Sequence, residues 1–257
     1  MNILASSWFL TLRLLRHLLR QPWSIAFTLL QPIVWMLLYG QLFRHIADLP
    51  GFSGMSYITF LTPAIVIMSG LFSAGFVGLG ILTDVDSGLM DRFLTSPVSR
   101  PSLILDRLIS LAIKIVPQTF ILLGLGMLLG ARYAGGVPGF FVLLGAAILL
   151  ATAFGGLSIG LALITRKQDT VIGAMNFILL PLTFLSGAFM VTSLVPGWIQ
   201  AIALLNPVNW SVEAARSGFQ AHPDWYLVTT RLAVLAVFML ASCCFATVSF
   251  RHYRRSA

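Results

Sequence analysis

Residues 139–164 read GFFVLLGAAILLATAFGGLSIGLALI, an apolar stretch without a single charged side chain. A helix rises about 1.5 Å per residue, so a helix of this length crosses the roughly 30 Å hydrocarbon core of a bilayer. The stretch lacks the regular alternation of apolar and polar residues that is typical of a barrel strand. It therefore predicts a transmembrane helix.

Five more apolar runs of similar length lie along the chain. They cover residues 23–43, 57–82, 108–130, 171–192 and 227–250. Of the 257 residues, 58% are hydrophobic and only 9% are charged, whereas a soluble domain carries roughly 25% charged residues. Too few polar side chains are present to cover a surface that faces water. We therefore expect a single domain over residues 1–257, an all-α integral membrane protein with six transmembrane helices.

The basic residues outside these runs are divided unevenly between the two sides of the membrane. One set of segments carries Arg13, Arg16, Arg20, Arg92, Arg100, Arg107, Arg166, Lys167, Arg251, Arg254 and Arg255, and the other set carries Arg44, Arg132, Arg216 and Arg231. The positive-inside rule places the richer set, and with it both termini, in the cytoplasm. The net charge of +8 fits this membrane pattern, and no basic patch with interleaved aromatic residues indicates nucleic-acid binding.

Residues 3–20 differ from the apolar runs because they form two separate stripes at helical spacing. Trp8 and Leu12 belong to an apolar stripe, whereas Arg13 and Arg16 belong to a basic one. This pattern predicts an amphipathic interfacial helix that lies along the membrane surface, with its arginines against the anionic lipids of the cytoplasmic leaflet.

Lys114 is a charged residue inside the predicted span 108–130. A charge within a span is unfavourable in lipid and usually faces the interior of the bundle, where Lys114 would contact substrate or act as a pivot. The alternative is that its long side chain reaches the cytoplasmic interface, since it lies only about two turns past Arg107. We favour this second interpretation, and the first remains open.

Gly156-Leu157-Ser158-Ile159-Gly160 matches the nucleophile elbow of serine hydrolases. Such an elbow needs a strand-to-helix turn and a nearby base, but the match lies within an apolar run and every histidine lies outside the predicted spans. We instead expect a small-residue face, on which Gly156 and Gly160 let two helices approach closely. The sequence contains no Walker A motif and no metal-ligand spacing, so we expect no catalytic site, cofactor or metal in this chain.

The external connection, residues 193–226, contains apolar stretches that are too short to span, such as residues 198–205. Trp198 and Trp210 suit a membrane–water interface, and Asn206-Pro207 between them is a turn signal. We expect a re-entrant helical segment here. The candidates for an external gate are Trp198, Asn206, Pro207 and Trp210.

The cytoplasmic connection, residues 84–107, contains a short amphipathic pattern. It predicts a helix from about Ser87 to Thr95, with Ser87 as its N-cap and Pro97 beyond its end. The apolar face of this helix holds Leu89, Phe93 and Leu94. Such a face fits either the membrane surface or a groove in a partner protein.

Two sets of motifs, one on each predicted side of the membrane, resemble a known family. MDRFLTSPVSR (residues 90–100) resembles the signature of ABC transporter permeases with the type-2 transmembrane domain. FLSGAFM (184–190), VPGW (195–198) and LNPVNW (205–210) are similar to the outer re-entrant segment of that family, in the form found in bacterial daunorubicin-resistance exporters. Many drug-type relatives carry proline where this chain has Val191, a departure that softens a kink.

The resemblance implies partners that the residues alone do not. It implies a dimer of permeases, built from two copies or from two similar chains, in a bacterial plasma (inner) membrane. Each permease pairs with a separate ATPase subunit, two copies per complex, which binds ATP and Mg. The cytoplasmic segment is then the coupling helix that docks into the ATPase. Its candidate coupling residues are Leu89, Asp91, Arg92, Phe93, Leu94, Thr95, Ser96 and Pro97.

The expected function is ATP-driven export of a hydrophobic or amphipathic molecule, a drug-like compound or a lipid, from the cytoplasm or the inner leaflet. The spans contain few charged groups, so a highly charged cargo is not expected. The first alternative is a transporter driven by an ion gradient, which needs acidic or histidine relays within its spans. No Asp, Glu or His falls clearly within the six predicted spans. The second alternative is a membrane protein that transports nothing, such as an assembly factor.

Overall fold

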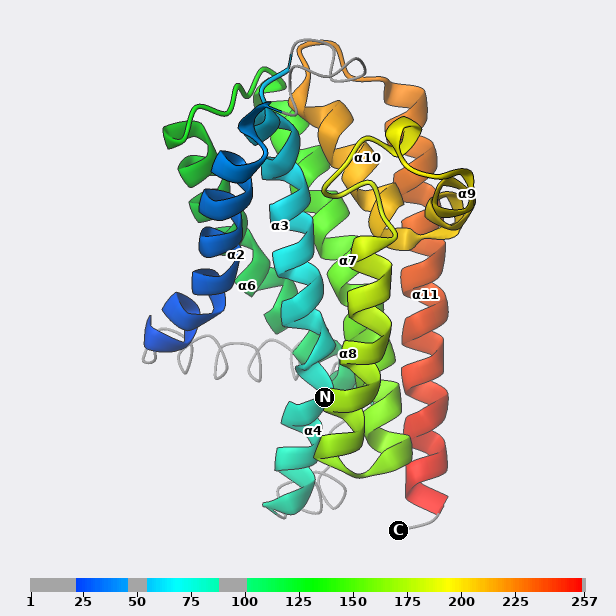
Figure 1. The fold of residues 1–257 in the computed structure, drawn as a ribbon. Coiled ribbons are helices and arrows are strands. Elements are labelled where there is room, and N and C mark those ends of the chain that lie inside the picture. Colours follow the sequence, from blue (N-terminus) through cyan, green and yellow to red (C-terminus); the bar gives the residue numbers. More distant parts are fainter. Residues whose placement is uncertain (1–21, 46–54, 88–100, 256–257) are drawn as a thin grey trace.

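The computed structural model describes residues 22–45, 55–87 and 101–255, and all the regular elements in these ranges are helices (Figure 1). They are α2 (Pro22–Leu42), α3 (Tyr57–Gly75), α4 (Val77–Asp86), α6 (Pro101–Leu128), α7 (Gly136–Thr165), α8 (Gln168–Phe184), the 3-10 turn η2 (Thr192–Leu194), α9 (Gly197–Leu205), α10 (Pro207–Phe219) and α11 (Trp225–Arg255). The predicted interfacial helix 3–20 and the candidate coupling residues from Leu89 to Pro97 lie outside the described residues.

Four helical stretches in the described part of the chain are long and apolar enough to cross a membrane. They are Tyr57–Asp86, Ile104–Leu128, Gly136–Thr165 and Trp225–Arg251. The other two predicted spans coincide with α2 and α8, which have 21 and 17 residues. The chain is therefore an all-helical, multi-pass membrane protein, and the count of six spans stays a prediction.

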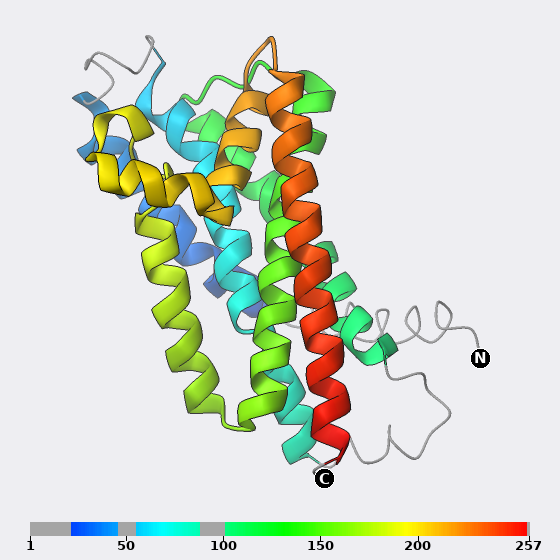
Figure 2. The same cartoon turned by 90° about the vertical axis from the view of Figure 1, so that its right-hand side faces the viewer.

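α7 lies at the centre of the helical bundle. It contacts α3, α4, α6, α8, α10 and α11, and Figures 1 and 2 show α11 running alongside it. A helix with neighbours on every side is apolar all round, which explains why residues 139–164 carry no charge. Large apolar side chains on the peripheral helices face outward, for example Phe177 on α8 and Val237 on α11, as expected for a surface in contact with lipid.

Gly156 and Gly160 on α7 allow the close approach of α11. A Cβ atom at Gly156 would lie 3.1 Å from the backbone of Ser242, and one at Gly160 would lie 2.4 Å from the ring of Phe245. The prediction of a small-residue face is confirmed. The segment around Ser158 is continuous helix, so the nucleophile-elbow interpretation is wrong.

The predicted span 57–82 is not one uninterrupted helix. It is broken at Phe76, where α3 ends and α4 begins, and α4 then continues to Asp86. The cause lies in α7: the hydroxyl of Ser158 bonds to the backbone on both sides of the break, as described below. A serine 80 residues away therefore sets this irregularity.

The connection between α4 and α6 is shorter than the predicted 84–107. α4 reaches Asp86 and α6 begins at Pro101, because proline is well tolerated in the first turn of a helix. Ser87 closes α4, since its N–H donates to the Thr83 carbonyl at 3.0 Å and its Oγ donates at 3.2 Å to the next carbonyl along. Ser87 is thus the C-cap of α4, and the predicted helix that it would begin lies outside the described residues.

The predicted span 171–192 is too long. α8 ends at Phe184, and residues 185–191, called the outer segment below, leave the helix. The Leu185 N–H still bonds to the Pro181 carbonyl, but the backbone of Gly187 and the carbonyl of Ala188 bond to side chains of α10. The hydrogen bonds that α10 makes to this backbone compensate for the end of α8 at Phe184.

The predicted re-entrant segment consists of two unlike helices. α9 lies across the direction of the bundle, seen end-on in Figure 1 and lengthwise in Figure 2. α10 instead packs inside the bundle against α3, α7 and α11, because it buries a face that includes Val208, Val212 and Ala215. Below, the end of the bundle that carries α9 is called the α9 end, and the end that carries α4 is called the α4 end.

Candidate functional site

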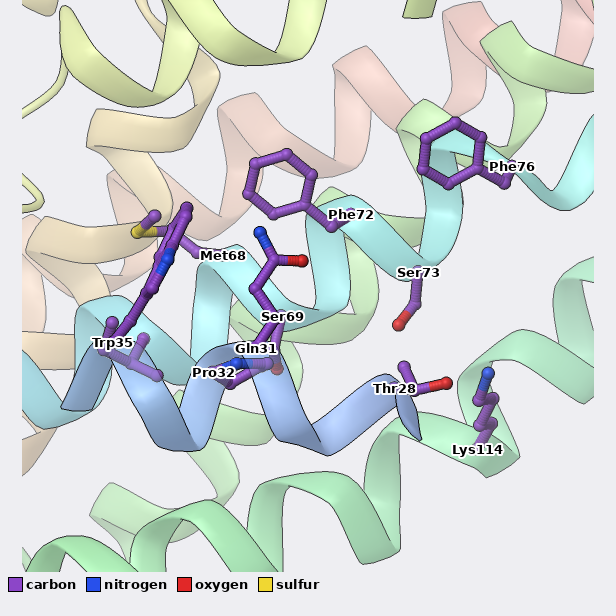
Figure 3. A pocket seen from close by; sticks show the side chains of 11 residues that line it. Thr28, Gln31, Pro32, Trp35, Met68, Ser69, Phe72, Ser73, Phe76 and Lys114 are labelled. Atoms are coloured by element: carbon purple, nitrogen blue, oxygen red, sulfur yellow. The ribbon is translucent and has the colours of Figure 1, made fainter. Parts of the chain in front are cut away.

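A cavity of about 270 Å³ lies between α2, α3 and α6 (Figure 3). Its wall consists of Thr28, Gln31, Pro32, Trp35, Ile65, Met68, Ser69, Phe72, Ser73, Phe76 and Lys114. Apolar side chains dominate this wall, and a few hydroxyl, amide and ammonium groups interrupt it. This composition suits the binding of a largely apolar molecule that carries a polar group.

Lys114 lies where this cavity meets a second one. The second cavity, of about 330 Å³, shares Ser73, Phe76 and Lys114 with the first and continues along α4 and α6 as far as Arg107. Lys114 is 10 residues from the start and 14 from the end of the candidate span Ile104–Leu128, close to its middle. The side chain forms part of a cavity wall, an arrangement that favours the contact interpretation of Lys114 over the interfacial one.

Aromatic rings cluster around Trp35 in the wall of the first cavity. The Trp35 ring is edge-on to Phe72 at 5.9 Å and to Phe189 of the outer segment at 6.0 Å, measured between ring centres. Phe189 also meets Tyr39 at 5.1 Å and Phe184 at 5.7 Å. These contacts place the Phe189 ring between Trp35 of the cavity wall and the rings of Tyr39 and Phe184.

Side chains of α10 hold the outer segment in place. Arg216 donates to the carbonyl oxygens of Gly187 at 2.6 Å and Ala188 at 2.8 Å, and to the Phe60 carbonyl at 3.1 Å. Asn209 accepts a hydrogen bond from the Gly187 N–H at 2.9 Å. The backbone of Gly187 is therefore held from both sides.

Further polar contacts connect the outer segment and α10 to α3 and α11. Tyr57 at the start of α3 donates its hydroxyl to the Phe189 carbonyl at 3.0 Å. Glu213 accepts from Asn209 Nδ2 at 2.9 Å, and Arg231 Nε on α11 lies 2.8 Å from the second oxygen of the same carboxylate. The outer segment, α3, α10 and α11 are thus joined by one polar network.

The four predicted gate residues lie at the junction of α8, α9 and α10 and do not line the cavity. Asn206 is buried and caps α10, accepting from Val208 N–H and donating to the Leu182 and Leu185 carbonyls. Pro207 is the first residue of α10, and the indole N–H of Trp210 donates to the Leu204 carbonyl at 2.7 Å. Trp198 is 62% exposed and faces outward, as an interfacial tryptophan does.

At the α4 end, polar contacts join the helices that flank residues 88–100. Arg107 on α6 forms an ion pair with Asp84 on α4 and donates to the Gly80 carbonyl at 3.4 Å. Gln168, the first residue of α8, donates to Asp86 at 3.2 Å. These contacts join the end of α4 to α6 and to the start of α8.

The break between α3 and α4 is bridged by Ser158. Its Oγ donates to the Gly75 carbonyl at 2.6 Å and accepts from the Gly78 N–H at 3.0 Å. A Cβ atom at Gly78 would lie 2.3 Å from the Ser158 carbonyl oxygen, so only glycine fits there. This junction connects the α4 end mechanically to the helix that lines the cavity.

The structure brings together residues that the sequence analysis did not single out, namely Trp35, Phe189, Asn209 and Arg216. A usable signal existed on α10: Asn209, Glu213 and Arg216 follow one another at spacings of four and three residues, which places them on one helical face. No group of three or more His, Cys, Asp or Glu that is able to hold a metal ion occurs among the described residues.

The bundle is that of a multi-pass membrane protein with a cavity between its helices. Comparison with known proteins agrees, since residues 6–219 match the family described as ABC-2 type transporter. The chain belongs to this family, and it is the membrane-spanning permease subunit of an ABC exporter.

Several curated proteins are similar to most of the chain. The daunorubicin resistance ABC transporter permease protein DrrB1 of Streptomyces coeruleorubidus is 26% identical over 234 residues, which cover 91% of this chain and 80% of that protein. The probable doxorubicin resistance permease protein DrrC of Mycobacterium tuberculosis is 24% identical, with 80% and 74% covered. The inner membrane transport permease YadH of Escherichia coli K12 is 27% identical, with 83% of each chain covered.

Proposed function

We propose that this permease exports a hydrophobic or amphipathic molecule, a drug-like compound or a lipid, from the cytoplasm or inner leaflet. The observation that carries the proposal is the mostly apolar cavity between α2, α3 and α6, with Phe189 packed on Trp35 of its wall. Alternating access requires a path that is closed on one side at a time, and we assign this closure to Phe189. The names of the relatives DrrB1 and DrrC support a drug-like cargo.

The orientation follows from the charge asymmetry. The α4 end and both termini lie in the cytoplasm of a bacterium, the α9 end lies outside its inner membrane, and six helices cross the bilayer. In this orientation Phe189 closes the external side of the path. Asn206, Pro207 and Trp210 hold the frame of that external gate, and Trp198 anchors it at the membrane surface.

The energy comes from a separate ATPase subunit that binds ATP and Mg. Two ATPase copies serve a pair of permeases, formed by two copies of this chain or by two similar chains. Residues 88–100 contact the ATPase: Phe93 and Leu94 act as apolar anchors, Asp91 and Arg92 set orientation, and Pro97 stiffens the return to α6. Leu89, Thr95 and Ser96 complete the contact.

A movement at this contact reaches the cavity by two routes. The Asp84–Arg107 ion pair ties α4 to α6, so both helices that flank the contact respond together. The Ser158 junction then passes a displacement of α4 to α3, which carries Phe72 and Ser73 in the cavity wall. Docking of the ATPase is thereby linked to the shape of the cavity.

The test is co-purification of the ATPase with variants of this chain, combined with ATP hydrolysis in reconstituted membranes. Loss of one good interface anchor costs about 2 kcal/mol, or roughly thirtyfold in affinity. Phe93→Ala therefore detaches the ATPase, and Arg92→Ala weakens it less. Phe177→Ala is the matched control, because this aromatic side chain is 81% exposed on α8, outside the proposed contact. Unchanged binding and hydrolysis in Phe93→Ala, Leu94→Ala and Pro97→Ala together would falsify this coupling contact.

A further inference from the structure

The cavity between α2, α3 and α6 carries a cationic group at one end. Figure 3 shows Trp35 and Met68 at one end, with the Gln31 amide beside Phe72, and Thr28, Ser73, Phe76 and Lys114 toward the other end. The aromatic rings of Trp35 and Phe72 offer apolar surface, whereas Lys114 offers a cation. An elongated ligand with one apolar and one polar part fits such a cavity in a single orientation.

Among the described residues, the cation at this end of the cavity has no counter-charge. Within the described residues Lys114 has no hydrogen-bond or ion-pair partner, and neither cavity that it lines contains a carboxylate. Arg107, the other cation of the second cavity, differs because it is paired with Asp84. An unpaired ammonium group away from bulk water attracts an anion more strongly than one at an exposed surface.

Two further polar groups near Lys114 have unused hydrogen-bonding capacity. The hydroxyl oxygens of Ser73 and Ser110 are buried and bond to no group in the described part of the chain. Ser73 lines both cavities, and Ser110 lines the second one beside Lys114. Buried hydroxyl groups normally have a partner, so these two serines have a donor to offer to a polar ligand group beside Lys114.

We propose that this cavity selects an amphipathic molecule with a single anionic group, which binds to Lys114 while the apolar part lies against Trp35, Met68 and Phe72. Ser73 and Ser110 donate to the same anionic group from α3 and α6. A cationic amphipath is disfavoured here, since none of the described residues that line the two cavities is acidic. This inference rests on the proposed function, because it takes the cavity to be the path of the exported molecule. It adds the charge of that molecule.

The experiment measures binding to the full chain in nanodiscs of phosphatidylcholine. The probes are 11-(dansylamino)undecanoic acid and its neutral methyl ester, followed by energy transfer from tryptophan. The acid binds about tenfold more tightly than the ester, as one charge-assisted contact provides. Lys114→Gln removes this preference, so that acid and ester bind with similar affinity. Lys114→Arg retains the preference, and Trp35→Phe reduces the transfer signal of both probes.

Two results overturn the inference: equal binding of acid and ester by the unaltered chain, or an acid preference that survives Lys114→Gln. Discs that contain phosphatidylglycerol identify the source of the anion. If this lipid displaces the acid only when Lys114 is present, a membrane lipid is a natural ligand. If it does not, the ligand is an anionic amphipath from the cytoplasm. Because the binding assay needs neither the ATPase nor export, its failure is distinct from a failure of the proposed function.

Discussion

The guanidinium carbon of Arg216 lies 3.4 Å from the centre of the Phe60 ring. The same side chain also donates to the Phe60 carbonyl on α3 and to two carbonyls of the outer segment. A planar guanidinium is suited to this double task, because its face stacks on an aromatic ring while its edge donates several hydrogen bonds. Arg216 therefore fixes the outer segment, and with it Phe189, against α3.

Replacement of Arg216 should destabilise the closed external side. In Arg216→Ala three carbonyl oxygens lose their donor, and we expect a loss of about 2 kcal/mol or more in stability, since unsatisfied buried acceptors are unfavourable. Arg216→Lys should be intermediate, because an ammonium group cannot stack and reach all three carbonyls. Thermal unfolding in detergent measures the effect. Arg132→Ala, at an exposed arginine, is the control, and an equally small shift in both alanine variants would contradict the assignment.

The Ser158 junction should matter more than an ordinary buried serine. Ser158→Ala leaves the Gly75 carbonyl and the Gly78 N–H without a partner, so we expect a loss of about 1–3 kcal/mol together with weaker coupling of ATP hydrolysis to transport. Ser249→Ala is a matched control, because that buried hydroxyl bonds only to Phe245 of its own helix. Similar behaviour of the two variants would argue against a junction role.

The sequence predicted the central helix well and its irregular neighbours poorly. The charge-free run 139–164 lies within α7 (Gly136–Thr165) because a helix surrounded by other helices excludes charge, which is a property of its own residues. The break at Phe76 and the early end of α8 depend instead on side chains that reach in from α7 and α10. Hydropathy along one segment contains no information about side chains from other helices. The span 57–82 was therefore predicted without its break, and the span 171–192 was predicted too long.

In the candidate site, the sequence indicated only a residue whose chemistry differs from that of its own segment. Lys114 stood out as a charge inside a span. Phe189 and Trp35 did not, because an aromatic residue in an apolar run has the same appearance whether it faces lipid or a cavity. Arg216 was assigned to an external connection, and its partners are backbone carbonyls, which no side-chain pattern reveals.

The ion pair between Asp84 and Arg107 should couple the two helices that flank residues 88–100. Its side chains are 28% and 21% exposed, so a double-mutant cycle should give an interaction of about 1 kcal/mol. Arg107→Asp places two carboxylates together and should reduce ATPase-linked transport, and adding Asp84→Arg should restore part of it. Transport by reconstituted variants provides the measurement. No recovery in the double reversal would mean that the pair does not act as a unit.

The orientation is testable with single cysteines in a chain whose Cys243 and Cys244 are replaced by alanine. Ser53→Cys and Ala221→Cys should react with an impermeant thiol reagent on intact cells, because the α9 end is predicted to be external. Ser87→Cys and Gln168→Cys should react only after permeabilisation. Labelling of position 168 on intact cells would contradict the six-span orientation.

The last prediction concerns Phe189 as the plug of the cavity. Its ring lies 6.0 Å from that of Trp35, and Ser73 lines the cavity on the far side of this contact from the α9 end. In the same cysteine-free chain, Ser73→Cys should therefore be protected from an impermeant maleimide added outside. Phe189→Ala removes the ring without removing the backbone bonds to Tyr57, Asn209 and Arg216, so the outer segment should stay in place while the path opens.

The expected result is that external maleimide labels Ser73→Cys only when Phe189→Ala is also present, as measured by a gel shift on intact cells. Phe177→Ala is the control, because that side chain lies on the outer surface of the bundle and its loss opens nothing. Labelling from outside with Phe189 intact would show that the cavity is not closed by this ring. Protection that persists in Phe189→Ala, while reagent from the cytoplasmic side still reacts, would place the barrier elsewhere. Because Phe189→Ala keeps the backbone hydrogen bonds of the outer segment, either outcome reports on the phenylalanine ring and not on the polar network that holds this segment.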